Sequence, residues 1–433
     1  MSTRQKIRLP YIDNIRSLCI YSLFIWHTCE VFHCKEGFYI EGTKDFLCTY
    51  VYCFVSPWIM AVMFFIAGIS SMLSLENRSL KQFYKDRVKR ILKPTIAGII
   101  LWVPFGAYFV MKNHFSYEGN LLSGMMYFFT HCNEDMYGYD GSFTPAQLWF
   151  VCFLCAYLFL AYPVIKYALD KKEVLADKKI VSWKTILCLV VVNFVLCYGS
   201  TEETFLAFGM FFVMGLVLHN NKSFYEFIEE NWKLLLFSAL TVNLMASYAL
   251  ILIRDLEVWT WQYAVCRMIW SAGRVLAVFA VLGAGKVWLN IKGPVWKYLS
   301  SNSFSYYFLH MQILIAVAYY VITYVNAMVG IQWLLIISIS VVIISNNKTK
   351  TDFHAFFPRY IYDRVKNWQV VKSHPCRRVT IAQVAACHLS WWRYHYFLQT
   401  DRHETWKLLR LSRQQSHCQR QKMHYLCQKC LLT

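Results

Sequence analysis

Long apolar stretches separated by short polar segments recur along the first 345 residues of the chain. A bilayer core about 30 Å thick needs roughly 20 apolar residues of helix, and ten stretches approach or exceed that length. We therefore expect an all-α protein, a polytopic transmembrane bundle of about ten helices. The fifth, sixth and tenth stretches are short, so tilted or re-entrant segments stay open alternatives. The expected spans are 11–32, 46–74, 94–111, 147–168, 185–198, 204–219, 233–253, 262–284, 302–325 and 331–345.

Basic residues are unevenly distributed between the polar segments. With the N-terminus placed in the cytoplasm, the inner segments contain 21 lysines and arginines, whereas the outer loops contain four. Cytoplasmic loops of membrane proteins carry such an excess of Lys and Arg. We therefore expect both ends of this core to face the cytoplasm, in a multi-pass protein of the plasma membrane. The four basic residues of the outer loops are Lys35, Lys44, Lys112 and Arg254.

Composition agrees with a membrane protein and divides the chain into two parts. Hydrophobic residues make up 57% of the sequence and charged residues 16%, which is rare in soluble domains. The net charge is +19, of which residues 346–433 carry +12. Anionic lipid headgroups attract such a cytoplasmic surplus, so we expect a lipid partner and no nucleic acid. We divide the chain into a membrane domain, 1–345, and a basic cytoplasmic tail, 346–433, poorly ordered or partly amphipathic.

The sixteen cysteines do not predict a disulfide framework. Most fall within expected spans, where cysteine acts as a small apolar residue, and we expect free thiols. Cys34, Cys48 and Cys132 lie in or beside outer loops and leave room for one bridge at most. The tail contains a single C-x-x-C, Cys427 to Cys430, whose surroundings fit no common zinc finger. We therefore expect no metal.

Four ionisable residues on the first expected helix are candidates for function, because a charge in a bilayer costs several kcal/mol unless it faces protein or water. Arg16 and His27 are eleven residues apart and share one helix face, at depths that differ by about 16 Å. Asp13 is placed to pair with Arg16, and Glu30 to accept a ring proton from His27. One face would then line a long cavity, with a cation near its inner mouth and a base deeper.

A structural role is the alternative for these residues. Asp13 and Arg16 would then extend to the membrane interface, and His27 would only hydrogen-bond a neighbouring helix. Four ionisable groups patterned on one helix favour the functional interpretation.

The first helix resembles that of the acyltransferase 3 family, in which a D-x-x-R pattern is followed by a histidine eleven residues after the arginine. Asp13, Arg16 and His27 match that pattern. An E-E-Q-F-Y stretch present in many members is replaced by 152–156, which favours a branch similar to the glucan succinyltransferase-like or other small-glycan acyltransferases. Further similar motifs follow in family order at Phe64–Gly68, Arg87–Pro94, Leu148–Val151, Phe211–Gly215 and Ser305–His310.

The resemblance implies an integral-membrane O-acyltransferase that moves an acetyl, succinyl or similar group from acyl-CoA to a hydroxyl of a carbohydrate or related acceptor. Acyl transfer needs a base for the hydroxyl proton and a site for the anionic carrier. His27 would be the base, assisted by Glu30, Arg16 and Asp13. The remaining candidates are Arg87, Arg90, Arg267 and Arg274 for the donor phosphates, and Trp149 and His310 for the acceptor. An acidic acceptor and the oxyanion are alternative ligands of Arg267 and Arg274.

These candidates have structural alternatives. Arg87 and Arg90 also fit an ordinary basic inner loop, Trp149 fits interfacial packing, and His310 fits a hydrogen bond between helices. A secondary transporter of an anionic solute is the rival function, since buried arginines and a cavity would serve it too. Inverted repeats and paired broken helices, which are frequent in transporters, are not visible in the sequence.

Overall fold

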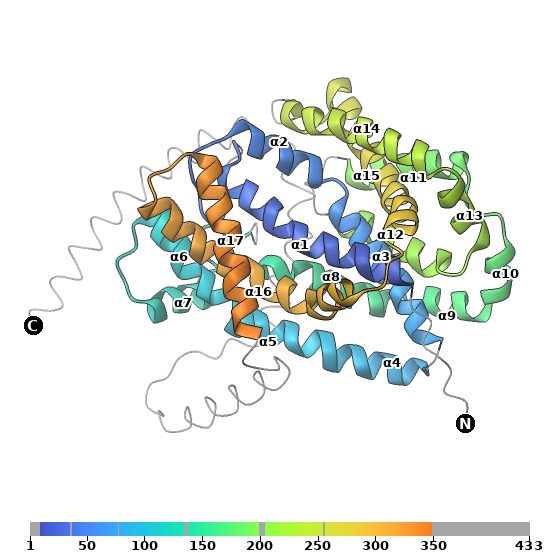
Figure 1. Ribbon diagram of the computed structural model, residues 1–433, viewed down its shortest axis with the longest axis horizontal. Coiled ribbons are helices and arrows are strands. Elements are labelled where there is room, and N and C mark those ends of the chain that lie inside the picture. The colour runs from blue at the N-terminus through green and yellow to red at the C-terminus, as the bar shows by residue number, and fades with distance from the viewer. Residues whose placement is uncertain are drawn as a thin grey trace, which may run out of the picture. The chain divides into compact units, whose positions relative to one another are not determined.

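Helices account for every regular element in the part of the chain that the structure describes. This computed structural model describes residues 9–34, 37–76, 78–133, 137–198, 204–253 and 256–348, with backbone alone at positions 347 and 348 (Figure 1). The prediction of an all-α protein is therefore confirmed. In chain order the elements are α1 (Pro10–Phe32), α2 (Phe46–Val55), α3 (Ile59–Leu75), α4 (Leu80–Arg87), η1 (Val88–Leu92), α5 (Lys93–Leu101), α6 (Val103–Phe115), α7 (Leu121–Thr130), η2 (Ala146–Leu148), α8 (Trp149–Leu160), α9 (Tyr162–Asp170), α10 (Lys172–Asp177), α11 (Trp183–Cys197), α12 (Phe205–Leu218), α13 (Lys222–Glu230), α14 (Trp232–Leu252), α15 (Trp261–Trp288), α16 (Pro294–Tyr324) and α17 (Val329–Lys348).

Six helical stretches of the described residues are long and apolar enough to cross a membrane, and two bent helix pairs raise that number to eight. The bent pairs are Ala146–Leu160 with Tyr162–Asp170, and Phe205–Leu218 with Lys222–Glu230. The chain is thus a multi-pass membrane protein. The expected number of ten is reached only by adding α1, which is polar, and α11, which has 15 residues. That number and the sides of the termini stay predictions.

A π-helical turn, η1, lies inside the helical stretch Leu80–Phe115. Pro94 has no N–H and cannot donate to a carbonyl four residues earlier. Just before it, the Lys93 N–H bonds the Val88 carbonyl, five residues back. An ordinary basic loop was the alternative for this segment, but Arg87 and Arg90 lie on a continuous helical stretch that contains one extra residue at the π turn. Such turns are frequent at functional sites.

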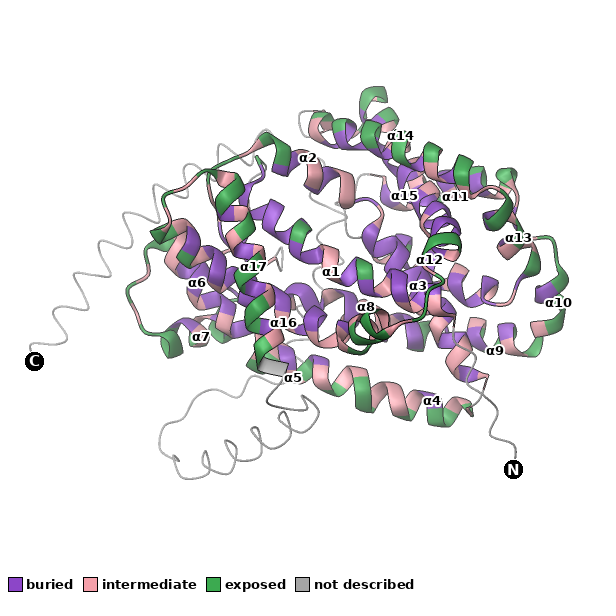
Figure 2. Cartoon of the chain, viewed as in Figure 1, coloured by how far each residue is buried: buried purple, intermediate pink, exposed green. Residues whose placement is uncertain are grey.

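The first helix lies among other helices along most of its length (Figure 1). It contacts α2, α3, α15, α16 and α17. Figure 2 shows α3 mostly buried, whereas α17 exposes much of its surface. At this position the helix buries His27 and Glu30 against protein, which lowers their cost in a membrane, whereas Asp13 and Arg16 stay partly exposed. The helix α1 thus places four of the candidate site residues inside the helical bundle.

Gly68 on α3 and Gly215 on α12 let two backbones touch. A β-carbon on Gly68 would lie 2.3 Å from the Phe212 carbonyl oxygen, and one on Gly215 would lie 2.1 Å from the Phe65 carbonyl oxygen. Both distances are far below van der Waals contact, so neither position has room for a side chain. These glycines therefore permit the close approach of α3 and α12.

Cys19, Cys29, Cys152, Cys155, Cys188 and Cys266 are free thiols, as expected for the spans, and Cys48 is a free thiol as well. The tail with its C-x-x-C, and the outer-loop residues Lys35 and Arg254, lie outside the described residues.

Candidate active site

His27 and Glu30 form a buried pair on the last turns of α1. His27 Nδ1 lies 2.5 Å from Glu30 Oε2, and each residue is 8% exposed. Because a carboxylate accepts hydrogen bonds, the ring proton belongs on Nδ1 and Nε2 keeps its lone pair. The contact expected from the i, i+3 spacing is therefore present. It leaves His27 in the tautomer that a general base needs.

His310 on α16 brings a second imidazole to this pair. The ring centroids of His27 and His310 are 5.2 Å apart with an interplanar angle of 30°. His310 Nδ1 lies 2.6 Å from the Tyr307 carbonyl oxygen, so it donates there. Its Nε2 is buried and has no hydrogen-bond partner among the described residues. Buried polar atoms of this kind are rare in folded proteins and call for a ligand or a chemical role.

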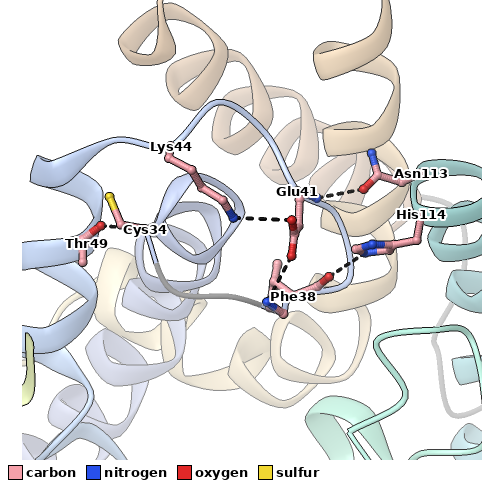
Figure 3. A network of polar contacts seen from close by, with 8 residues as sticks. Cys34, Phe38, Glu41, Lys44, Thr49, Asn113 and His114 are labelled. Atoms are coloured by element: carbon pink, nitrogen blue, oxygen red, sulfur yellow. Dashed lines mark hydrogen bonds and ion pairs between the residues drawn. The ribbon is translucent and has the colours of Figure 1, made fainter. Parts of the chain in front are cut away.

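The segment after α1 covers the His27 end of the helix. The Phe38 ring stacks 6.4 Å from the His27 ring and is 2% exposed. Figure 3 shows how this segment is held: His114 Nε2 donates to the Phe38 carbonyl oxygen at 2.9 Å, and the Glu41 N–H donates to Asn113 Oδ1 at 2.9 Å. Asn113 and His114, which lie near the end of α6, thus hold the segment over His27.

Glu41 is the charged centre of this segment. Its carboxylate accepts the Gly37 N–H at 3.0 Å and lies 3.5 Å from the Lys44 ammonium (Figure 3). Partial burial alone would raise its pKa, but the Gly37 hydrogen bond and the Lys44 charge outweigh burial, and the pKa lies below its usual value. The segment is thus held by an ionised carboxylate.

A cavity of about 270 Å³ lies at the opposite, Arg16 end of α1, and we call it the arginine cavity. Four arginines and two aspartates line it. Arg16 pairs with Asp13, as the spacing predicted, and Arg78 pairs with Asp86 at 3.0 Å. The other lining residues are Leu9, Ile12, Ser70, Leu73, Ser74, Arg87 and Arg90. With two carboxylates for four guanidinium groups, the wall keeps an excess of positive charge suited to phosphates.

Arg267 and Arg274 lie elsewhere, on α15. The Arg274 side chain is fully buried: its Nε donates to the Pro57 carbonyl oxygen at 2.7 Å, and its guanidinium lies 3.7 Å from the centroid of the Trp270 ring. Arg267 Nε donates to the Tyr263 hydroxyl at 3.1 Å, and its guanidinium lies 5.2 Å from the same Trp270 ring. The two arginines thus share Trp270, and neither lines the arginine cavity.

Trp149 begins α8 and packs into an aromatic cluster. Its ring lies 6.2 Å from Phe64 and 5.7 Å from Phe208. The Arg274 guanidinium lies 4.9 Å from the same Phe208 ring. Trp149 is therefore close to the buried arginine of α15, in contacts that serve packing.

The structure thus gathers the candidates into separate groups. Arg16, Arg87 and Arg90 share the arginine cavity, whereas His27 is not among the residues that line it. The common cavity expected for Arg16 and His27 stays a prediction. Arg78 was missed by sequence reasoning, because it looks like one more basic residue of an inner segment.

Gln147 and Gln312 were also missed. Each is at least 96% buried, and Gln312 Nε2 donates to Gln147 Oε1 at 3.1 Å, near the His310 turn of α16. A polar side chain within an apolar span is a signal in the sequence by which such residues can be found. The search for charged and imidazole groups passed over these neutral amides.

The comparisons with known proteins add one finding to this geometry. A family model described as an acyltransferase domain matches residues 9–345. The matched range contains every candidate residue above. Neither the comparison with curated proteins nor that with solved structures found a match.

Proposed function

The chain belongs to the acyltransferase family whose model matches it, and from this premise we propose that it transfers an acyl group from acyl-CoA to a hydroxyl group, with His27 as the general base. The acyl group would be acetyl, succinyl or similar, as in the glucan succinyltransferase-like branch. The acceptor would be a glycan or another hydroxyl-bearing small molecule. The protein would act in the plasma membrane.

The His27–Glu30 pair carries the proposal. In the transfer, His27 Nε2 takes the proton of the acceptor hydroxyl, and the oxygen forms a bond to the thioester carbonyl carbon. The carbon–sulfur bond then breaks, and the coenzyme A thiolate receives the proton from the imidazolium. Glu30, 2.5 Å from Nδ1, holds the tautomer and balances the positive charge that the ring acquires. Such assistance is typical of a histidine base oriented by a carboxylate.

The arginine cavity supports an anionic donor. Coenzyme A presents phosphate groups, and guanidinium groups bind phosphate oxygens through paired hydrogen bonds. We assign the phosphates to Arg16, Arg87 and Arg90, with Arg78 as a further contact. Asp13 orients Arg16 from the same helix. Arg267 and Arg274, which are held by aromatic rings away from this cavity, keep a role in the framework of α15.

Acceptor binding is assigned to the His27 end of α1. His310 offers an unpartnered Nε2 beside His27, which suits a hydroxyl donor. Trp149 lies in the aromatic cluster on α8 and contributes to that end through packing. A secondary transporter of an anionic solute, the rival function, is not favoured by membership in an acyltransferase family.

The test is acyl transfer by the purified protein. The full chain in lipid nanodiscs is incubated with acetyl-CoA or succinyl-CoA and a panel of glycans, and acylated products are identified by mass spectrometry. We expect one donor to be consumed with formation of an ester, and a His27→Ala variant to lose about 10²-fold to 10⁴-fold in rate. An ester that forms at full rate in His27→Ala removes His27 from the mechanism. Envelope glycans from cells with and without the protein provide the same test in vivo.

A further inference from the structure

A second, much smaller cavity lies at the His27 end of the molecule, and we call it the Gln312 cavity. Its wall includes Tyr39 from the segment after α1, Gly106 from α6 and Gln312 from α16. The space is about 10 Å³, roughly enough for one water molecule or one hydroxyl group. None of the residues that line it carries a charge. Its chemistry therefore differs from that of the arginine cavity.

The direction of the Gln312 amide follows from a chain of hydrogen bonds. Gln147 Nε2 donates to the Phe308 carbonyl oxygen at 3.0 Å, and a carbonyl oxygen can only accept. Gln147 Oε1 must then face Gln312, whose Nε2 donates to it at 3.1 Å. The remaining atom of the amide, Gln312 Oε1, points away from Gln147. The order of these contacts fixes which end of the side chain is the oxygen.

Gln312 Oε1 is a buried acceptor that lacks a donor. Gln312 is 1% exposed, and this oxygen has no hydrogen-bond partner among the described residues. It lies beside Gly106, where an added β-carbon would come within 1.8 Å of it. Glycine therefore keeps the oxygen in place and the cavity open. A buried carbonyl without a donor is costly, and a ligand with a hydroxyl proton would satisfy it.

The segment before α8 forms another part of the wall in an unusual backbone conformation. Gly138 and Gly141 have φ of 68° and 87°, and Ala146, directly before Gln147, has φ of 43°. A left-handed alanine is strained, and strained residues cluster at functional sites. All three residues line the cavity.

Two short contact paths connect this cavity to His27. The Tyr307 hydroxyl donates to the Gln147 carbonyl oxygen, and the Tyr307 ring lies 5.9 Å from His310, which stacks on His27. On the other side Tyr39 lines the cavity, and its neighbour Phe38 stacks on His27. A molecule anchored in the cavity would thus be close to the base.

We propose that the Gln312 cavity is a subsite for one non-reacting hydroxyl group of an uncharged acceptor, with Gln312 Oε1 accepting its hydrogen bond. The absence of charge in the lining argues against carboxylate or phosphate groups at this point, because a buried charge needs a partner. The inference rests on the proposed function, since it concerns the acceptor of the same transfer. Gln312 binds substrate in this proposal and takes no proton.

The experiment separates acceptor from donor kinetics in the full chain in nanodiscs. The probes are acetyl-CoA, methyl β-D-glucopyranoside and, as its charged analogue, methyl β-D-glucuronide. Gln312→Met removes the oxygen and keeps the length of the side chain, and Gly106→Ala fills the space beside it. Gly330→Ala is the control, because a β-carbon there meets nothing within 4 Å.

We expect Gln312→Met and Gly106→Ala each to raise KM for the glucoside about tenfold or more, with KM for acetyl-CoA within about twofold of wild type. Gly330→Ala should leave both constants unchanged. The wild type should use the glucoside at least about tenfold better than the glucuronide.

Three results would overturn the proposal: an unchanged glucoside KM in Gln312→Met, which would leave a water site only; a parallel rise of both KM values, which would indicate a structural role; or equal use of the glucuronide. The failure of the proposed function has a different signature, since transfer would then persist in His27→Ala whatever happens in Gln312→Met.

Discussion

The two cavities at opposite ends of α1 differ in size and charge. The arginine cavity has about 270 Å³ and is lined by Arg16, Arg78, Arg87 and Arg90. The Gln312 cavity has about 10 Å³ and an uncharged wall. Fixed cations attract an anionic carrier from a distance, whereas a lone carbonyl oxygen acts only within hydrogen-bond range. In the transfer that we propose, the arginine cavity would select the donor by charge and the Gln312 cavity would select the acceptor by fit.

Among substitutions that leave His27 itself in place, we expect the largest effect at the carboxylate beside this base. Glu30→Gln removes the charge that balances a protonated His27, so we expect kcat to fall about a hundredfold or more. KM for acyl-CoA should change little, because Glu30 lies at the end of α1 away from the arginine cavity. Steady-state kinetics in nanodiscs measure both constants. A matched substitution, Glu41→Gln, alters a carboxylate of the covering segment without touching His27. If kcat of Glu30→Gln equals that of wild type, the carboxylate does not assist the base.

An intermediate effect is expected at the arginine cavity. Arg87→Ala removes one charge-assisted phosphate contact and should raise KM for acyl-CoA about tenfold to a hundredfold, with KM for the acceptor unchanged. Lys89→Ala, two residues away on η1 and not part of the lining, is the control for loss of positive charge. Equal effects of the two substitutions would mean that only the overall basic surface matters. In that case the arginine cavity would not bind the donor specifically.

The smallest effect concerns the segment that covers His27. The pKa of Glu41 in the folded protein lies below the usual pKa of a glutamate. The ionised carboxylate therefore stabilises the fold fully at pH values above the usual pKa, and this stabilisation is lost as the pH falls through the lowered pKa. For a partly exposed ion pair we expect about 0.5 kcal/mol, or a decrease in Tm of about 1 °C for Glu41→Gln at pH 7. The difference in Tm between Glu41→Gln and wild type should disappear at pH values below the lowered pKa of Glu41. Thermal unfolding in detergent at pH 7 and in a series of acidic buffers measures it, and a constant difference would contradict the assignment.

Contacts within one helix could be predicted from the sequence. Asp13 with Arg16 and His27 with Glu30 are three residues apart, and helix geometry alone brings such side chains together. Gly68 and Gly215 could be assigned to helix packing because their neighbours are apolar. The helical class itself followed from the length of the apolar stretches.

Contacts between helices could not be predicted in this way. His27 meets His310, and Gln147 meets Gln312, across more than 160 residues of chain. Spacing on one helix carries no information about which face of another helix lies opposite. Arg267 and Arg274 illustrate the same limit: their spacing placed them on one side of α15, on which Trp270 also lies, but only packing shows that Arg274 meets Pro57 and Phe208 of other segments.

The π-helical turn at Val88–Leu92 bears on how this protein tolerates changes in chain length. A π turn contains one residue more than the α-helix needs, so deleting one residue there would leave a regular helix. Each residue of a helix turns the chain by about 100°. A deletion at the π turn removes the extra residue and would keep Arg87 in nearly the same orientation to the residues after Pro94, whereas a deletion elsewhere in the helix would rotate one part against the other. The helix thus tolerates the loss of one residue best at η1, beside the arginine to which we assign a phosphate contact.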